Sequence, residues 1–336
     1  MIDRVLIVGL GSIGKRHLRL ARTLLPKADI RILRHKVHKE TPDLADGLLF
    51  NIEDACLFKP QAAIIANPAP FHLSIAIALT EIGCHLLIEK PLSISTRNVN
   101  SLLERSQAKN NQVLLGYNLR FLPSLQRFRK LIKSGEIGKI LSVRCDVGHY
   151  LPSWRDGVDY KEGVSARSEL GGGVLLELSH ELDYLRWIFG EVSWVNAWLG
   201  QQSDLEIDVE DTAHLILGIG TEQTLVCSLN LDFVRRDTQR LCVAIGDSGS
   251  LRWNGRSGIV EKWDILAANW SAVSDQSENI EESYLFEWEH FIDCLNKDAS
   301  PSVSIEDGLA VLKVIDAARK SSDSLGSRLT IDREIH

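Results

Sequence analysis

Lys90 and His180 are the side chains of this sequence whose types and settings suit redox chemistry. The segment Glu89-Lys90-Pro91 closes the apolar run Cys84–Ile88. Proline disfavours a helical conformation of the residue before it, so Lys90 is expected to be extended at the end of a strand. In an open parallel α/β sheet that end faces the ligand crevice. An ammonium group there would stabilise a substrate oxygen, although a solvated lysine at an ordinary strand exit explains this segment equally well.

His180 lies in a helical pattern that covers Val174–Phe189. Residues three and four apart are neighbours on a helix, so Glu177, His180, Glu181 and Tyr184 are expected to share one face. An imidazole titrates near pH ~6.5 and suits proton transfer at neutral pH. A lone helix histidine is more often a packing residue. The flanking carboxylates and the preceding glycine run favour a catalytic base, with Glu177 as its orienting partner.

A glycine-rich turn, Gly9-Leu10-Gly11-Ser12-Ile13-Gly14, would bind a dinucleotide. It follows the apolar segment Arg4–Val8 and opens a helix over Ile13–Leu25, which is the context that this motif requires. Its glycines would permit a tight turn, an approach of backbone to pyrophosphate, and close packing of helix on strand. The cofactor contacts expected here are Gly9, Gly11, Ser12, Ile13 and Gly14.

The end of the second strand bears on the choice of nicotinamide cofactor. NAD enzymes usually carry Asp or Glu at that point to bind the ribose 2′-hydroxyl, whereas this chain has Leu33-Arg34-His35-Lys36. Arg34, with His35 or Lys36, would meet a 2′-phosphate instead. The sequence therefore predicts an NAD(P) enzyme and favours NADP, with a solvated basic loop as the alternative interpretation.

Polar or glycine-containing segments also follow other predicted strands. They are Ala66-Asn67-Pro68, Glu89-Lys90-Pro91 and Gly116-Tyr117-Asn118-Leu119-Arg120. Because the carboxyl ends of parallel strands meet at one edge of a sheet, these segments are expected to line one crevice. Asn67 or Asn118 taken alone is more simply a turn residue. The further cofactor contacts expected are Asn67, Pro68, His72, Glu89 and Asn118.

The elements that would position these residues indicate a division into domains. Apolar strands alternate with amphipathic helices in the first third of the chain, as in a doubly wound parallel sheet. From Val192 to Glu261, successive strands joined by short turns favour an antiparallel sheet. We therefore expect an α/β protein. Residues 1–120 would form a Rossmann dinucleotide-binding domain, and residues 121–336 a substrate-binding and oligomerisation α/β domain on a mainly antiparallel open sheet.

The composition argues against several other classes of protein. A formal net charge of −7 gives no electrostatic footprint for nucleic acid. No apolar stretch reaches the ~20 residues that span a bilayer, and the first residues lack the pattern of a signal peptide. The six cysteines are scattered, without a C-x-x-C pair or clustered histidines. We therefore expect reduced thiols, no metal site and a cytoplasmic location.

Several segments together point to a known family. They are GLGSIGKRH at 9–17, ANPAPFH at 66–72, EKP at 89–91, GYNLRFLP at 116–123 and GGGVLLELSHELDYLRW at 171–187. This set resembles the Gfo/Idh/MocA oxidoreductases. The resemblance implies an NAD(P)-dependent dehydrogenase or reductase acting on a CH–OH group of a sugar, sugar acid, nucleotide sugar or polyol. It also implies a homodimer or homotetramer built on the open sheet.

The resemblance places the family's catalytic lysine at Lys90 and its catalytic histidine at His180. Many members carry Asp four residues before that histidine, where this chain has Leu176. In the mechanism that we expect, His180 accepts the hydroxyl proton while hydride leaves the carbinol carbon, and Lys90 stabilises the oxygen. Both side chains would meet across the nicotinamide ring.

The polar segment Leu151–Leu170 is expected to border the substrate. Its aromatic and cationic side chains, together with Arg120, suggest a carbohydrate-like substrate that carries a carboxylate or phosphate. The substrate contacts expected are Lys90, Arg120, Trp154, Arg155, Tyr160, Arg167 and His180.

Other functions stay open on the sequence alone. A glycosidase that retains NAD and oxidises its substrate transiently would show no net conversion of added cofactor. A non-catalytic cofactor-binding regulator would tolerate replacement of Lys90 and His180, but the presence of both residues argues against it.

Overall fold

The computed structural model describes residues 2–34, 40–154, 157, 159–220, 225–273 and 280–332. The chain divides into two compact units. One contains Met1–Tyr117 and Leu285–Leu312, and the other contains Asn118–Tyr284 and Lys313–His336. The sequence-based division assigned every residue after 120 to a single domain, whereas Leu285–Leu312 folds with the first unit.

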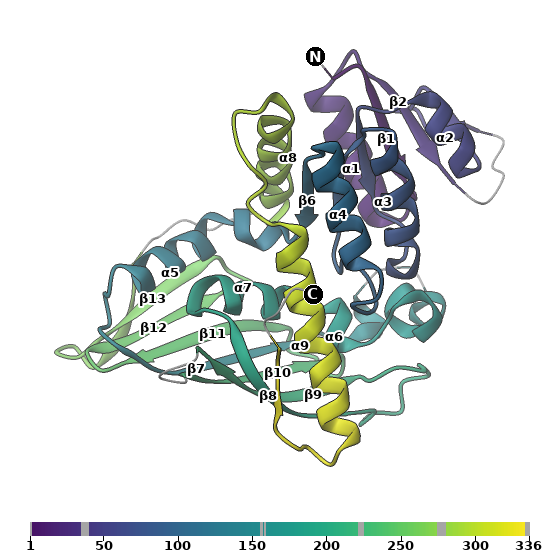
Figure 1. The fold of residues 1–336 in the computed structure, drawn as a ribbon. Coiled ribbons are helices and arrows are strands. Elements are labelled where there is room, and N and C mark those ends of the chain that lie inside the picture. The colour runs from purple at the N-terminus through teal and green to yellow at the C-terminus, as the bar shows by residue number, and fades with distance from the viewer. Residues whose placement is uncertain are drawn as a thin grey trace. The chain divides into compact units, whose positions relative to one another are not determined.

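The first unit is built on a parallel sheet whose described strands number six, in the order β3-β2-β1-β4-β5-β6 (Figure 1). The strands are β1 (Arg4–Val8), β2 (Asp29–Leu33), β3 (Gly47–Leu49), β4 (Ala62–Ile65), β5 (His85–Glu89) and β6 (Val113–Gly116). All neighbours pair in parallel register. The order runs outward from β1 in both directions, which confirms the predicted doubly wound Rossmann sheet.

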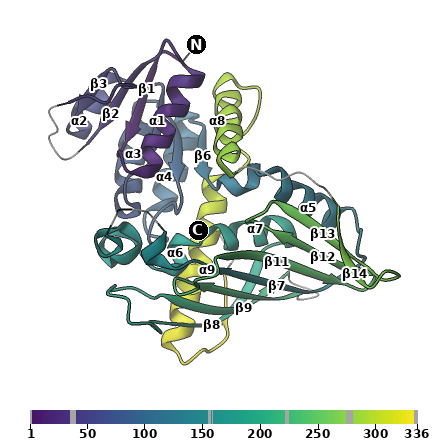
Figure 2. The same ribbon diagram turned by 180° about the vertical axis from the view of Figure 1, so that it is seen from behind.

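Helices cover both faces of this sheet (Figures 1 and 2). They are α1 (Ser12–Leu24), α2 (Ile52–Phe58), α3 (His72–Glu81), α4 (Val99–Lys109) and α8 (Ile280–Asn296), with the 3₁₀ turn η1 (Ala69–Phe71) before α3. Contacts join α2 to α3 and α3 to α4 on one face. On the other face, Trp288 of α8 donates to His17 of α1. With both faces covered, every residue of β4 is buried, which explains its uninterrupted apolar sequence.

The second unit is built on a larger sheet, which has nine strands among the described residues, in the order β14-β13-β12-β11-β7-β10-β9-β8-β15. The strands are β7 (Ile140–Gly148), β8 (Val192–Gly200), β9 (Thr212–Ile219), β10 (Leu225–Asp232), β11 (Gln239–Gly246), β12 (Gly249–Asn254), β13 (Ile259–Asp264), β14 (Asn269–Ala272) and β15 (Leu329–Thr330). Only β7 and β10 pair in parallel among these strands, so the predicted mainly antiparallel sheet is confirmed.

Alternating side chains give this sheet one buried face. In β9, Ala213, Leu215 and Leu217 are buried, whereas His214 and Ile216 are exposed. Period-2 alternation of this kind is expected of an antiparallel sheet with a single covered face. The helical elements of the unit are α5 (Pro123–Lys133), α6 (Val174–Glu177), α7 (His180–Phe189), the second half of α9 (Ile305–Asp323) and the 3₁₀ turns η2 (Asn118–Phe121), η3 (Leu151–Ser153), η4 (Tyr160–Glu162), η5 (Val164–Ala166) and η6 (Ser168–Leu170).

The helix predicted over residues 174–189 is interrupted. The first segment, α6, ends at Glu177, and α7 begins at His180. The amide of Glu181 bonds to the carbonyl of Leu178, three residues back, which tightens the turn between the two helices. The spacing argument that placed Glu177 and His180 on one helix face was therefore wrong, because it assumed a continuous helix.

Candidate active site

The glycine-rich turn has the backbone geometry that a dinucleotide requires. Gly9 has a φ of +86°, which L side chains rarely adopt. A Cβ on Gly14 would lie 2.3 Å from the carbonyl oxygen of Gly9, so only glycine lets α1 come this close. A Cβ on Gly11 would meet no atom within 4 Å, so this position is open to a ligand. The helix begins at Ser12, and its first amides, including that of Ile13, suit a pyrophosphate.

Asn67 follows β4 and presents a buried amide group next to this turn. A Cβ on Gly9 would lie 3.0 Å from the backbone of Asn67, so the two segments touch. The Oδ1 and Nδ2 atoms of Asn67 are buried and have no hydrogen-bond partner among the described residues. Buried polar atoms are normally bonded. The glycine turn and these two atoms therefore suit a site that a bound nicotinamide dinucleotide would complete.

His72 connects the segments that follow β4 and β5. Its Nε2 lies 2.7 Å from the carbonyl oxygen of Asn67, and its Nδ1 lies 2.9 Å from that of Pro91. Burial lowers the pKa of His72. Pro68 directly follows Asn67 and precedes η1 in an extended conformation. We expect His72 to act on the cofactor by holding these segments.

The end of β2 carries the residues that were predicted to select the cofactor. Arg34 directly follows β2, is half-buried, and donates its amide to the carbonyl of Leu49 at 2.9 Å. At the other end of β2, the carboxylate of Asp29 pairs with Arg31. His35 lies outside the described residues.

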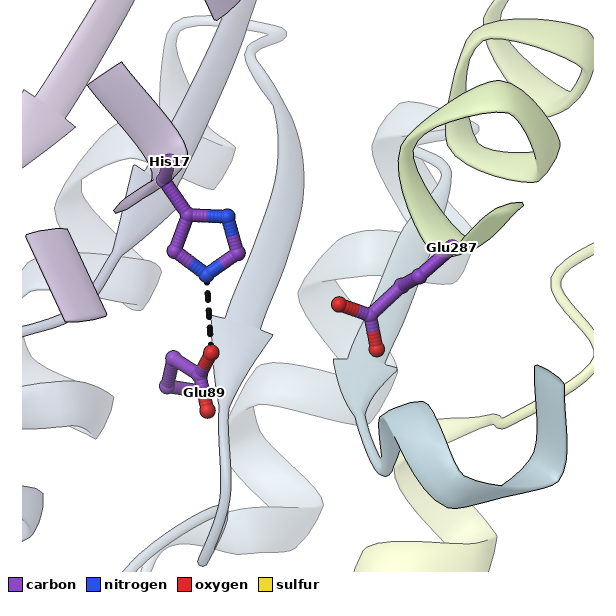
Figure 3. A group of neighbouring side chains, drawn as sticks. All are labelled: His17, Glu89 and Glu287. Carbon is purple, nitrogen blue, oxygen red and sulfur yellow. Dashed lines mark hydrogen bonds and ion pairs between the residues drawn. The ribbon is translucent and has the colours of Figure 1, made fainter. Parts of the chain in front are cut away.

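Lys90 stands at the carboxyl end of β5, in the same unit as the glycine turn, and is half-buried. The peptide bond that joins it to Pro91 is cis. Its amide donates to Oε2 of Glu89 at 3.2 Å. The other carboxylate oxygen, Oε1, lies 2.7 Å from Nε2 of His17 (Figure 3). Glu89 therefore connects the backbone of Lys90 to the buried side of α1.

Glu287 of α8 completes a cluster with His17 and Glu89 (Figure 3). Among the residues that the structure describes, these three have potential metal-ligand atoms within 4.8 Å of one another. Two ionised carboxylates about 5 Å apart would repel by roughly 3 kcal/mol at an effective dielectric constant of about 20. Burial, and then the charge of Glu89, raise the pKa of Glu287 well above its usual value. No motif in the sequence pointed to Glu287, because it lies on a helix distant in the chain.

His180 is the first residue of α7 and is half-buried. Two other members of the predicted polar face, Glu181 and Tyr184, are buried. The Glu181 carboxylate lies 2.8 Å from Nε of Arg240, and Oη of Tyr184 lies 2.9 Å from Sγ of Cys145. These two polar side chains of α7 thus have internal partners.

Arg120 forms a buried ion pair within the second unit. Its guanidinium donates two hydrogen bonds to Asp183 of α7, at 2.8 Å and 2.5 Å, and both side chains are at most 5% exposed. The two-bond geometry suits guanidinium and carboxylate. Asn118, two residues earlier, donates to Ser283 at 2.7 Å. Arg120 and Asn118, which were predicted to bind ligands, thus each have a partner within the protein.

The segment that was expected to border the substrate is a series of 3₁₀ turns with internal bonds. Trp154 stacks on His149, with ring centroids 5.3 Å apart. Arg167 donates to Glu162 at 2.7 Å, and Tyr160 accepts a bond from the amide of Glu206. Arg155 lies outside the described residues.

Glu210 contacts the start of α6, shortly before His180, and was not singled out from the sequence. Its carboxylate accepts the amide of Leu175 at 3.2 Å, and its carbonyl accepts the amide of Val174, so it anchors the start of α6. Burial raises the pKa of Glu210. A Cβ on Gly173 would lie 2.5 Å from this carboxylate. The glycine run Gly171-Gly172-Gly173 thus indicated the close approach of another segment. The approaching residue, Glu210, could not be named because it lies far along the chain.

Comparison with known proteins identifies the family. Residues 4–117 match the NAD-binding Rossmann fold of an oxidoreductase family, and residues 129–327 match its C-terminal alpha/beta domain. The chain belongs to the Gfo/Idh/MocA oxidoreductase family. The resemblance inferred from the motifs is therefore confirmed.

Similar proteins within the family include sugar and polyol dehydrogenases. The levoglucosan dehydrogenase of Pseudarthrobacter phenanthrenivorans is 31% identical over 211 residues, which cover 57% of this chain and 53% of that protein. The myo-inositol 2-dehydrogenase of Thermotoga maritima is 27% identical over 333 residues, which cover 95% of this chain and 96% of that protein. The aligned part thus spans about half the length of the first relative and nearly all of the second.

Solved structures share the fold along the whole chain. A levoglucosan dehydrogenase in complex with NADH and levoglucosan superposes with a TM-score of 0.84 at 22% identity, covering 99% of this chain and 100% of that one. The WlbA dehydrogenase from Bordetella pertussis, in complex with NADH and UDP-GlcNAcA, superposes with a TM-score of 0.81 at 20% identity and the same coverage.

Among the described residues, every helix is too short or too polar to cross a membrane.

Proposed function

We propose that this protein is an NAD(P)-dependent dehydrogenase or reductase that acts on the CH–OH group of a carbohydrate-like substrate. The observation that carries the proposal is the placement of Lys90 at the carboxyl end of β5, in the unit that holds the glycine turn. In open parallel sheets, ligands bind beyond the carboxyl ends of the strands. The family's relatives that are named dehydrogenases of levoglucosan and inositol support the substrate class.

In the proposed mechanism, the bound nicotinamide supplies the hydride acceptor, or the donor in the reverse direction. The Lys90 ammonium donates a hydrogen bond to the substrate oxygen and stabilises the negative charge that develops on it. His180 takes the hydroxyl proton during oxidation and returns it during reduction. Glu177 was expected to orient His180; this role stays a prediction, because the helix break removes the spacing argument for it.

The substrate class is proposed as sugars, sugar acids, nucleotide sugars or polyols. The segment that contains η3 to η6 offers the aromatic surface of Trp154 and the polar side chains of Tyr160 and Arg167 for recognition. Arg120 is a weaker candidate for this role, since its guanidinium already pairs with Asp183.

The test is a screen of these compounds, with added NAD⁺ and NADP⁺ in separate reactions, followed through the absorbance of the reduced nicotinamide. We expect net formation of reduced cofactor with at least one compound class. Release of sugar without net cofactor reduction would contradict the proposal and indicate a glycosidase that retains its cofactor. Binding of cofactor without turnover of any compound would instead indicate a regulator.

The cofactor is proposed to be NADP, on the basis of Arg34 at the end of β2. A guanidinium can bind a 2′-phosphate through two hydrogen bonds, whereas NAD enzymes place an acid there. We expect titrations followed by intrinsic tryptophan fluorescence to show tighter binding of NADP⁺ than of NAD⁺. Arg34→Ala should remove about tenfold or more of the NADP⁺ affinity, while Arg19→Ala on the exposed side of α1 is the control. A wild-type preference for NAD⁺ would refute this assignment.

We also propose a homodimer or homotetramer that forms through the open face of the nine-stranded sheet. Trp198, Ile216 and Val226 of neighbouring strands are 45%, 38% and 43% exposed on it. Large apolar side chains clustered on one surface indicate an interaction site. Analytical ultracentrifugation should give a multiple of the monomer mass, and Ile216→Lys with Val226→Lys should reduce it; Leu57→Lys, at a 77% exposed position, is the control. A monomeric wild type would contradict the proposal.

A cytoplasmic location is proposed from the six free cysteines.

A further inference from the structure

The buried cluster around Glu89 has a hydrogen-bond order that can be assigned atom by atom. Nε1 of Trp288 donates to Nδ1 of His17 at 2.8 Å, and Nε2 of His17 lies 2.7 Å from Oε1 of Glu89. An indole nitrogen only donates, so Nδ1 of His17 must be the acceptor. A histidine whose Nδ1 accepts carries its proton on Nε2. His17 is therefore a neutral donor to Glu89.

This assignment bears on whether the cluster binds a metal ion. A metal held by His17 would need the lone pair of Nε2, which is the atom that carries the proton. The other ring nitrogen is blocked by the Trp288 donor. His17 is thus unsuited as a ligand, although its atoms lie within ligand distance of two carboxylates.

A proton on Glu287 removes the second negative charge from the same cluster. Both carboxyl oxygens of Glu287 are buried and have no hydrogen-bond partner among the described residues, and the side chain points from α8 towards His17 and Glu89 (Figure 3). The titratable groups that face it are His17 from α1, which is neutral, and Glu89 from β5, which accepts two N–H groups. Glu89 is thus the one stabilised as a carboxylate, and Glu287 the one that keeps a proton.

We propose that Glu287 is a neutral carboxylic acid and that Trp288 and His17 are positioning residues, which hold Glu89 as the ionised acceptor for the peptide N–H of Lys90. The chain of contacts runs from Trp288 to His17, from His17 to Oε1 of Glu89, and from Oε2 of Glu89 to the amide of Lys90. A neutral Glu287 leaves the charge of Glu89 in place without repelling it. This inference rests on the role proposed for Lys90.

The proton on Glu287 is tested by the pH dependence of stability, which does not require activity. An unfolded glutamate releases its proton near pH ~4.3, whereas native Glu287 keeps it. Above that pH the unfolded state binds fewer protons, so stability falls as pH rises. Glu287→Gln removes this contribution to the pH dependence of stability, because glutamine does not release a proton. We expect the ratio of the unfolding constants of wild type and E287Q to rise with pH between about pH 6 and pH 8, with about tenfold per pH unit as the limit while native Glu287 keeps its proton.

The matched control is Glu289→Gln, which changes an exposed acid on the same helix. Its unfolding constant should keep a fixed ratio to that of the wild type over this pH range. A fixed ratio for E287Q as well would show that Glu287 ionises normally, and would overturn the proposal.

The positioning role is tested with Trp288→Phe, which removes the donor to His17. The ¹⁵N chemical shifts of the His17 ring should change from the Nε2–H tautomer to a mixture, and kcat should fall about 10- to 100-fold because Lys90 is misplaced. The KM for the cofactor should stay within about twofold. E287Q, which is neutral and similar in shape, should keep kcat within about twofold of the wild type. Phe286→Ala on the exposed side of α8 is the control.

The outcomes separate this inference from the proposed function. A tautomer change in W288F without loss of kcat, while Lys90→Ala is inactive, would overturn the positioning role alone. Insensitivity of turnover to both W288F and Lys90→Ala would reject the proposed role of Lys90, and the positioning role with it. In that case the ¹⁵N shifts of the His17 ring still decide its tautomer, and the pH dependence of stability still decides whether Glu287 carries a proton.

Discussion

Replacing Lys90 with alanine is expected to lower kcat by about 10²–10³-fold. The ammonium acts on charge that develops on the substrate oxygen, so its loss weakens the transition state more than the ground state. Because Lys90 follows β5 while the pyrophosphate is expected at the glycine turn, the Kd for the cofactor should stay within about threefold. Initial rates and fluorescence titrations measure both quantities.

The control for this variant is Lys109→Ala, which removes a half-exposed lysine of α4 from the same unit. Its turnover should match the wild type, because an exposed ion pair contributes little. Lys90→Arg should not restore the rate, since a planar guanidinium cannot replace a compact ammonium. Wild-type turnover by the Lys90→Ala enzyme would eliminate the proposed role.

Replacing His180 with alanine is expected to lower kcat by about 10²–10⁴-fold, the range that general acid–base catalysis contributes. Oxidation requires the neutral imidazole as a base, so the wild-type rate should rise with pH as that ring loses its proton. The variant should lose this dependence, because the group that titrates is gone. The measurement is a pH profile of kcat for oxidation in both enzymes.

Chemical rescue provides the controls for both catalytic residues. Added imidazole should restore part of the rate of His180→Ala but not that of Lys90→Ala, and a small primary amine should do the reverse. Each molecule supplies only the missing function, so crossed rescue excludes a general loss of folding. Equal rescue of both variants by either compound would show that the roles are assigned wrongly.

The Rossmann unit could be predicted from the sequence in detail because its signals are local. The boundaries expected for the first strand, Arg4–Val8, agree with the structure. The glycine turn requires a positive φ at Gly9 and close packing at Gly14, both of which are properties of a few consecutive residues. Lys90 at a strand end likewise follows from its neighbours in the chain.

The helix that carries His180 shows where this reasoning failed. Periodicity predicted one continuous helix, but α6 is anchored separately through Glu210, and Glu181 and Tyr184 of α7 have internal partners. Helical spacing assumes an unbroken helix. Whether the helix is unbroken cannot be read from the segment itself, because Glu210 and Arg240 approach it from other parts of the chain.

The sequence by itself determined the family, the Rossmann fold and the candidate residues Lys90 and His180, because motifs and strand periodicity are encoded in short stretches of chain. Only the tertiary structure decided the environment of Glu89. Trp288 and His17 are separated by 271 residues, and their hydrogen bond exists because residues 285–312 fold against the first unit. Protonation states depend on which atoms meet in a buried space, and that is fixed by packing rather than by neighbours in the chain.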